Sequence, residues 1–472
     1  MKLWNHQQDA IKFQSTRQGT LLNHGMASGK TCTAISICQS KNHKTILIVC
    51  PVSVIQTWVD EFDKFTTDEF SVLALTKGSV VKKTEAAEKF LKQKSSKKKV
   101  IVLNYESAWR PGLGPIRDKH RRITDYGLLK KINWDIIICD ECHKICAPGS
   151  NVSKFFASLS QPKDGKTTDY LGLTGTPFED SPLEAYGIFR FLDRSIFGTS
   201  FFHFKHRYAE MGGFQNKEVR GYVNMDDFKE KIDLITHTVK TDDVIELPDI
   251  VHRHISCELS SKAMKMYKEF QNELILEFKD SVLSAENVLV KGLRLSQIAS
   301  GVVTDDLGSE HVIDDAKIRA AKDIVDGLPK SEPIVVFARF RAEIARVKEI
   351  LEPRKKHSKK RCSELSGSVN ELAEWKAGKT QIICVSIQAG GAGIDLSRAR
   401  YTIYMSTGYS RKQYLQSLAR TRRPGSDLKQ KIIYYHLNAT GTIDYQIIKA
   451  LEKKEKISDI IFNSVGLCQR AA

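Results

Sequence analysis

The sequence lacks any apolar run long enough to cross a bilayer. Its first residues, MKLWNHQQDAIKF, are polar and contain no uninterrupted apolar core of a signal peptide. We therefore expect no membrane segment and an intracellular location, cytoplasmic in a bacterial or host cell and nuclear if the source is eukaryotic. The ten cysteines are scattered singly, which is typical of reduced, buried thiols and argues against a secreted disulfide scaffold.

Acidic residues are also in short supply, since 56 Asp and Glu face 73 Lys and Arg, for a formal net charge of +17. An acidic polymer is the partner that such a charge favours. The hydrophobic fraction of 41% suffices for ordinary globular cores, and the length of 472 residues exceeds what one core usually organises. We expect two main domains, and we find no tandem repeat.

Short apolar, β-branched runs alternate with amphipathic stretches over residues 20–180, and the same alternation returns from about 316 onward. This pattern predicts an α/β fold with two parallel sheets. The first set of runs is TILIVC, VIVLNY, WDIIICDE and YLGLTGT, and the second is PIVVFARF, QIICVSI, ARYTIYMS and QKIIYYHL.

The segment between the two sets of strands has a different pattern, because it contains long helical stretches such as SSKAMKMYKEFQNELILEF and NVLVKGLRLSQIAS. We predict a first lobe at 1–195, a linker with a mostly helical protrusion at 196–315, and a second lobe at 316–472. After the last strand, apolar residues at helical spacing predict a C-terminal helix that packs back on a lobe. They are Ile447, Ile448, Leu451, Ile457, Ile460 and Ile461.

The segment HGMASGKT follows the apolar TLL and precedes the helical CTAISIC, which is the strand, loop and helix order of a phosphate-binding loop. Small residues let backbone N–H groups converge on phosphate oxygens at a helix N-terminus. Lys30 would pair with the β and γ phosphates of ATP, and Thr31 would ligate Mg²⁺. The remaining predicted cofactor-binding residues of the loop are Gly25, Met26, Ala27, Ser28 and Gly29.

The run WDIIICDECHK ends a buried strand with two adjacent carboxylates, a position that needs a cation or a reaction to justify the charge. We predict that Asp140 holds Mg²⁺ and that Glu141 orients the attacking water. A zinc site is the rival interpretation, because Cys139, Cys142, His143 and Cys146 are close in sequence. We reject it, since Cys142 and His143 are adjacent and no second CxxC exists.

With these two motifs, the sequence resembles superfamily 2 helicases, and specifically the Swi/Snf-type DNA translocases. The first half matches through NHQ, the phosphate loop, IVCPVSVIQTWVDEFDKF, VLNYES, DECHK and LTGTPFED. The second half matches through VVFARFRAEI, SIQAGGAGIDL and QSLARTRRPG. The resemblance implies two RecA-like lobes that close on ATP, joined by a helical protrusion that follows THTVKTDDVIELPDIVHRHISCELS.

The resemblance also implies site residues in the first lobe. Gln7 would read the adenine, and Thr174, Gly175 and Thr176 would couple the nucleotide pocket to the nucleic acid. The predicted nucleic-acid contacts of this lobe are Pro51, Ser53, Tyr105 and Glu106.

In the second lobe, Gln416, Arg420 and Arg423 are four and three residues apart, so a helix would set them on one face. The two arginines would stabilise charge on the transferring phosphoryl group, for which a planar, permanently charged guanidinium is suited. By resemblance, Asp395 would contact the nucleotide ribose. The predicted nucleic-acid contacts are Arg339, Ser386, Gln388 and Gly390.

Ala27 stands where the family usually has glycine, and LARTRRPG lacks the histidine typical of chromatin remodellers. These departures favour a compact bacterial or viral member. We expect an ATP- and Mg²⁺-dependent motor on duplex or branched DNA rather than RNA, acting as a monomer, with an oligomer and contacts to DNA-bound proteins left open. The alternatives are a strand-separating helicase for forks and Holliday junctions, and a nucleic-acid-binding scaffold with a degenerate nucleotide site.

Overall fold

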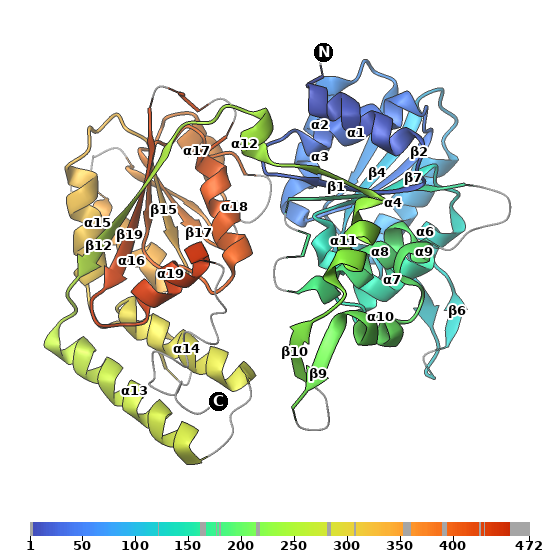
Figure 1. Ribbon diagram of the computed structural model, residues 1–472. Helices are drawn as coiled ribbons and strands as arrows, with labels where there is room; N and C mark the ends of the chain where they lie inside the picture. The colour runs from blue at the N-terminus through green and yellow to red at the C-terminus, as the bar shows by residue number, and fades with distance from the viewer. Residues whose placement is uncertain are drawn as a thin grey trace. The chain divides into compact units, whose positions relative to one another are not determined.

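The computed structural model describes residues 3–453 apart from 121, 161–166, 176, 179–180, 214–217, 281–284, 306–307, 353–359, 389–393, 424–425 and 429. The chain divides into two compact units, Met1–Ile245 and Glu246–Ala472 (Figure 1). Each unit has its own parallel sheet flanked by helices, so the predicted α/β class with two parallel-sheet lobes is confirmed. The three-part division at 195 and 315 stays a prediction. No helix among the described residues is long and apolar enough to cross a membrane.

The first unit contains a seven-stranded sheet in the order β11-β1-β8-β7-β2-β4-β3, with every neighbouring pair parallel. Its central strands are largely apolar and buried, as is typical of a parallel sheet with helices on both faces. The register places Ile46 opposite Ile136 and Leu47 opposite Ile101. The strands are β1 (Gly19–His24), β2 (Thr45–Cys50), β3 (Phe70–Leu75), β4 (Lys98–Asn104), β7 (Ile136–Asp140), β8 (Asp169–Thr174) and β11 (Thr236–Val239).

Amphipathic helices pack on this sheet, and α3 shows how: Ile55, Trp58 and Phe62 are buried at helical spacing while the opposite face is polar. Its helices are α1 (Asn5–Ser15), α2 (Lys30–Ser40), α3 (Ile55–Phe65), α4 (Val80–Lys92), α5 (Tyr105–Ala108), α6 (Leu128–Lys131), α7 (Asn151–Leu159), α8 (Ala185–Leu192), α9 (Arg194–Phe197), α10 (Phe201–Tyr208), α11 (Met225–Asp233) and α12 (Thr241–Val244). Two antiparallel ribbons complete the unit, β5 (Ile116–Arg117) with β6 (Ile123–Asp125) and β9 (Ala209–Gly212) with β10 (Glu218–Tyr222).

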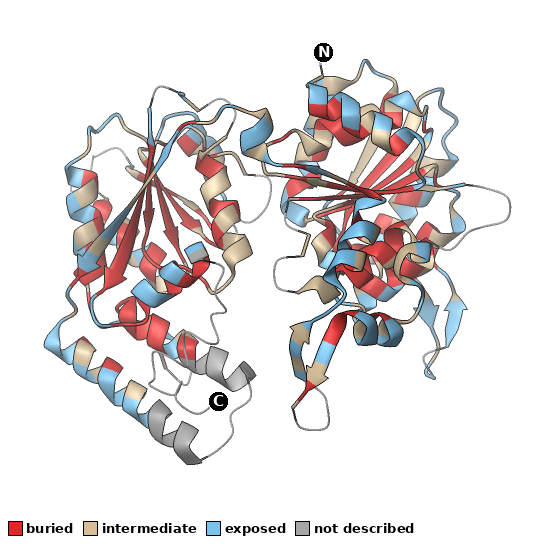
Figure 2. Cartoon of the chain, in the orientation of Figure 1, coloured by how far each residue is buried: buried red, intermediate tan, exposed pale blue. Residues whose placement is uncertain are grey.

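The second unit contains a six-stranded parallel sheet in the order β12-β19-β18-β15-β17-β16. Its central strand has a core on each face: Val335 and Phe337 join one hydrophobic cluster, and Ile334 and Val336 join another. Figure 2 shows the central strands of both sheets as buried. The strands are β12 (Ile250–Cys257), β15 (Ile334–Ala338), β16 (Cys362–Leu365), β17 (Ile382–Ser386), β18 (Tyr401–Tyr404) and β19 (Ile432–Ala439).

Two long helices, α13 (Ser261–Asp280) and α14 (Ala285–Ala299), follow β12, in agreement with the predicted helical protrusion. The ribbon of β13 (Val302–Thr304) and β14 (Glu310–Val312) comes next. The other helices are α15 (Ala316–Asp326), α16 (Arg341–Leu351), α17 (Leu372–Lys376), α18 (Arg411–Thr421) and α19 (Asp444–Lys453).

The predicted C-terminal helix is α19. Ile447, Ile448 and Leu451 are buried in the core of the second unit, as their spacing predicts. At its start, Asp444 forms an ion pair of 2.5 Å with the buried Lys317. Ile457, Ile460 and Ile461 lie outside the described residues.

Candidate functional site

The phosphate-loop candidate connects β1 to α2 and adopts two left-handed backbone conformations, at Ala27 (φ 63°) and Gly29 (φ 78°). Glycine takes this conformation freely, whereas an alanine loses about 1–2 kcal/mol. Lys30 Nζ donates to the carbonyl oxygens of His24 (2.9 Å) and Gly25 (3.0 Å), so the amine lies over the loop. Thr31 follows in the first turn of α2. The loop thus combines two left-handed residues with the Lys30 amine, and its binding of phosphate stays a prediction.

Gln7 lies beside this loop. It is buried, its Oε1 accepts from the backbone N–H of Trp4 (2.9 Å), and its Nε2 donates to the carbonyl of Gly29 (3.4 Å). A side chain at position 29 would collide with this amide, which explains glycine there. The neighbouring His6 ring nitrogen lies 2.9 Å from the carbonyl oxygen of Ser28. Helix α1 thus brings the predicted adenine-reading residue to the loop.

The two carboxylates lie at the end of β7, where Asp140 is the last residue of the strand and Glu141 follows it. Asp140 Oδ2 accepts a hydrogen bond of 2.9 Å from Trp58 Nε1, and the backbone carbonyl of Asp140 accepts one of 2.8 Å from the hydroxyl of Tyr105. Glu141 has left-handed backbone angles (φ 55°, ψ 51°), and its Oε2 lies 3.2 Å from His143 Nδ1. The carboxylates of Asp140 and Glu141 are therefore positioned by different neighbours.

Burial raises the pKa of the Asp140 carboxyl to about 6, and the adjacent Glu141 charge adds to this effect. The Trp58 hydrogen bond and the Lys30 charge act in the opposite direction without cancelling it. The charge of Lys30 acts on Asp140, so the loop lies near the end of the carboxylate strand. A bound cation would stabilise the ionised Asp140, which fits the predicted Mg²⁺ ligand.

Asp140→Asn is expected to raise the melting temperature of the nucleotide-free protein at pH 8 by a few degrees, since Asn keeps an acceptor for Trp58 and removes a buried charge. The pKa is 3.8 ordinarily and about 6 in the fold, so the folded protein binds the proton more tightly. Ionisation of Asp140 therefore opposes folding above pH 6, and the opposition fades as pH falls from 6 toward 3.8. Thermal melts of both proteins should show the difference shrinking between pH 7 and pH 5; a difference that grows in acid would contradict the assignment.

The residues at the end of β8 and just after it lie beside the phosphate-loop candidate. Thr174 ends the strand and is fully buried, and Gly175 packs so closely on the loop that a side chain there would lie 3.1 Å from the His24 carbonyl oxygen. Thr176 lies outside the described residues. Because β1, β8 and β7 are parallel neighbours, their carboxyl ends bring Lys30, Asp140 and Gly175 to one edge of the sheet.

The nucleic-acid candidates of the first unit follow β2 and β4, which are paired neighbours. Ser53 and Glu106 are exposed, and Pro51 is half-buried. The Tyr105 ring is buried instead, and it connects this edge to the carbonyl of Asp140 through its hydroxyl. The assignment of these four residues to nucleic acid stays a prediction.

In the second unit, Arg339, Ser386 and Gln388 line one cavity of about 730 Å³ at the carboxyl ends of the paired strands β15 and β17. Arg341, Lys348 and two serines, Ser366 and Ser368, line the same cavity and were not among the predicted residues. Buried Glu343 accepts from the backbone N–H groups of Arg339 and Phe340 and so holds the start of α16. Gly390 lies outside the described residues. Three predicted nucleic-acid contacts and the side chains of Arg341 and Lys348 therefore line the same cavity.

The three residues at the end of the second unit are placed by α18. Gln416 and Arg420 are buried on this helix, but the helix ends at Thr421, so Arg423 lies beyond it. The expectation that one helix carries all three was wrong for Arg423, because a residue that precedes proline disfavours helical backbone and Pro424 follows it. Arg423 Nη1 instead donates to the carbonyl of Ile394 (3.0 Å).

That contact brings Arg423 beside Asp395, whose Oδ1 accepts from the backbone N–H of Ser397 (3.0 Å). Burial alone would raise the pKa of Asp395, but hydrogen bonds from Ser397 and the charge of Arg423 outweigh it, and the pKa lies below its ordinary value. Asp395 is therefore ionised at neutral pH, unlike a carboxyl that burial keeps protonated.

Two residues of these sites, Trp58 and His237, were not predicted from the sequence. Trp58 entered the sequence analysis only within the matched segment IVCPVSVIQTWVDEFDKF, although its indole donates a hydrogen bond to Asp140. His237, on β11, lies 2.8 Å from the ring of His24 at the base of the loop. Only the pairing of β11 with β1 brings His237 there, so no local signal was available.

Comparison with known proteins matches residues 6–301 to the SNF2-related domain and residues 316–425 to the helicase conserved C-terminal domain. The chain is 23% identical to a protein of Acyrthosiphon pisum secondary endosymbiont phage 1, over 93% of this chain and 94% of that protein. It is also 23% identical to an uncharacterized ATP-dependent helicase of Mycoplasma genitalium, over 96% of this chain and 42% of that protein, so it spans about two fifths of this relative. A solved Sulfolobus solfataricus SWI2/SNF2 ATPase core in complex with dsDNA has 21% identity and a TM-score of 0.43, covering 99% and 94% of the two chains.

Proposed function

This chain belongs to the SNF2-related family of helicase-type ATPases, and on that basis we propose that it moves along double-stranded DNA and remodels branched DNA or protein–DNA complexes. Its ATP dependence follows from the family. The observation that carries the proposal is the meeting of Lys30, Asp140 and Gly175 at one sheet edge, beside exposed candidates for nucleic-acid contact. Nucleotide chemistry and a DNA track would thus share one rigid edge.

ATP is proposed to bind the first unit through Lys30, Thr31 and Gln7. Mg²⁺, held by Thr31 and Asp140, would neutralise charge on the phosphates. Glu141 is proposed to orient the attacking water, and His143 Nδ1 lies 3.2 Å from its carboxylate. Arg420 and Arg423 of the second unit stabilise the charge that develops on the γ-phosphate.

Both units are proposed to grip the phosphate backbone of the DNA, and the grip alternates with the nucleotide state. The second unit offers the cavity that contains Arg339, Arg341 and Lys348. Lys348 also pairs with Glu364 (2.6 Å), which leaves the two arginines as the principal phosphate contacts there. Contacts to phosphates carry no base information, so movement is expected to be indifferent to sequence.

The test is the ATPase rate with single-stranded, duplex, forked and four-way DNA and with RNA. The proposal expects the largest stimulation by duplex or branched DNA; equal rates with and without every nucleic acid would reject it and favour the scaffold alternative. A strand-displacement assay on forked DNA separates translocation from unwinding, because only a strand-separating helicase releases the labelled strand.

Salt should weaken the DNA-stimulated rate strongly. For about six phosphate contacts, raising salt from 50 to 200 mM is expected to lower the apparent DNA affinity by about 10³-fold, because bound counterions are released from DNA. The measurement is the DNA concentration for half-maximal ATPase at each salt concentration, with the DNA-free rate as control. Two duplexes of unrelated sequence should give one slope, and a shallow or sequence-dependent slope would contradict backbone tracking.

A further inference from the structure

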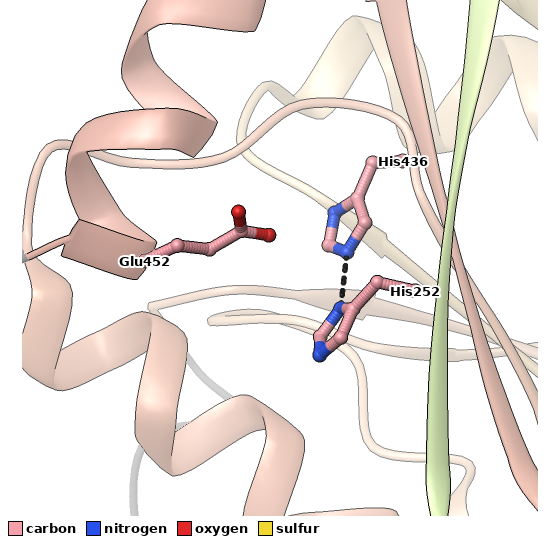
Figure 3. Close-up of side chains that lie close together, drawn as sticks. All are labelled: His252, His436 and Glu452. Carbon is pink, nitrogen blue, oxygen red and sulfur yellow. Dashed lines mark hydrogen bonds between the residues drawn. The ribbon is translucent and has the colours of Figure 1, made fainter.

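Three side chains distant in the sequence converge in the second unit: His252 from β12, His436 from β19 and Glu452 from α19 (Figure 3). One nitrogen or oxygen atom from each lies within 4.8 Å of the others. The closest pair is His252 Nδ1 and His436 Nε2, at 3.0 Å. The Glu452 carboxylate points toward the His436 ring (Figure 3).

The fold creates this cluster through strand pairing. β12 pairs in parallel with β19 and sets His254 opposite His436, so His252, two residues earlier, lies on the same face of the sheet. Helix α19 follows β19 and places Glu452 near its end over this face. His254 Nε2 lies 3.8 Å from Glu452 Oε1, so the carboxylate lies beside a third histidine of this strand pair.

One polar atom of the cluster makes no hydrogen bond to any of the described residues. His436 is 1% exposed, and its buried Nδ1 has no hydrogen-bond partner among the described residues. The Tyr414 hydroxyl lies 3.5 Å from Nε2, which is too long for a strong hydrogen bond. A neutral imidazole is the form that ligates metals, and each of these two rings has a nitrogen that can do so.

We propose that His252, His436 and Glu452 form a binding site for a zinc ion. Zinc accepts imidazole nitrogen and carboxylate oxygen in a tetrahedron, and bonds of about 2.05 Å separate its ligand atoms by about 3.3 Å. The two nitrogens lie 3.0 Å apart, close to this spacing, and the zinc ion would replace the hydrogen bond between them. The Glu452 side chain, which is 37% exposed, has room to close the remaining distance. A water would complete the tetrahedron.

Such an ion would fasten the C-terminal helix to the edge strand β12. The site is separate from the ATP residues and uses different chemistry, since Mg²⁺ prefers oxygen ligands and imidazole favours zinc. The inference therefore stands or fails independently of the proposed motor function.

The experiment titrates Zn²⁺ and Co²⁺ into metal-stripped, full-length protein without nucleotide. We expect one ion per chain, a higher melting temperature with Zn²⁺, and Co²⁺ absorption bands of a nitrogen and oxygen tetrahedron without the charge-transfer bands of a thiolate. His252→Ala and Glu452→Gln should each weaken binding by at least about tenfold, and the double variant should abolish it.

The matched control is His311→Ala, which removes an exposed histidine that also pairs with a carboxylate, Asp305, at 2.8 Å. This variant should keep full binding. If both Glu452→Gln and His252→Ala fold and bind Zn²⁺ like the parent, if no saturable site appears, or if Co²⁺ shows thiolate bands, the cluster is only a hydrogen-bonded histidine pair and the proposal is overturned. Melting curves of the metal-free variants verify folding, and Glu452→Gln, on the helix surface, decides the matter should His252→Ala unfold.

Discussion

Glu141→Gln is expected to bind ATP with nearly the affinity of the parent and to lose about 10²- to 10⁴-fold in turnover, the range that one positioned proton acceptor contributes. Glutamine has the same shape and the same backbone preferences, so the left-handed conformation at position 141 costs no more than before. It lacks the negative charge that attracts the proton of the attacking water. The measurements are nucleotide binding by fluorescence titration and phosphate release at saturating DNA.

Lys30→Ala is the comparison for this experiment. The Lys30 amine contacts the loop carbonyls of His24 and Gly25, and the loss of this amine should abolish ATP binding rather than turnover alone. A second comparison is Asp140→Asn, which should weaken the Mg²⁺ dependence of binding. Normal hydrolysis by Glu141→Gln would show that another group orients the water and that the role assigned to Glu141 is wrong.

Arg420→Ala is expected to leave ATP affinity within about threefold of the parent and to lower turnover by about 10³-fold or more, the size of effect known for an arginine at a transferring phosphoryl group. The guanidinium acts on charge that develops only in the transition state, so its loss lowers kcat and kcat/KM together. Single-turnover kinetics with saturating DNA measure the chemical step directly.

Arg422→Ala is the matched control, because this neighbouring arginine donates to the carbonyl of Pro248 (2.9 Å) and has no assigned part in hydrolysis. Arg420→Lys keeps the charge but not the planar fork, and it should recover only a small part of the rate. Arg420 is buried, so circular dichroism must show a folded variant. A large loss of affinity with an unchanged rate would contradict the assignment.

Local sequence order was sufficient for most of the fold. TILIVC and WDIIICDE form β2 and β7 because short, β-branched apolar runs are stable where helices cover both faces of a sheet. The phosphate loop and the carboxylate pair could be located for the same reason, since each is a continuous segment after a strand. Spacing failed at Arg423, where the following proline ends the helical backbone sooner than periodicity suggests.

The sequence by itself determined the class of fold, the family and the order of the motifs, because these depend on residues that are neighbours along the chain. Only the tertiary structure decided that Trp58 bonds Asp140, that β11 places His237 behind the loop, and that His252 meets His436. Each of these contacts joins segments tens to hundreds of residues apart, and strand order, which brings them together, arises from the packing of the whole sheet rather than from any local pattern.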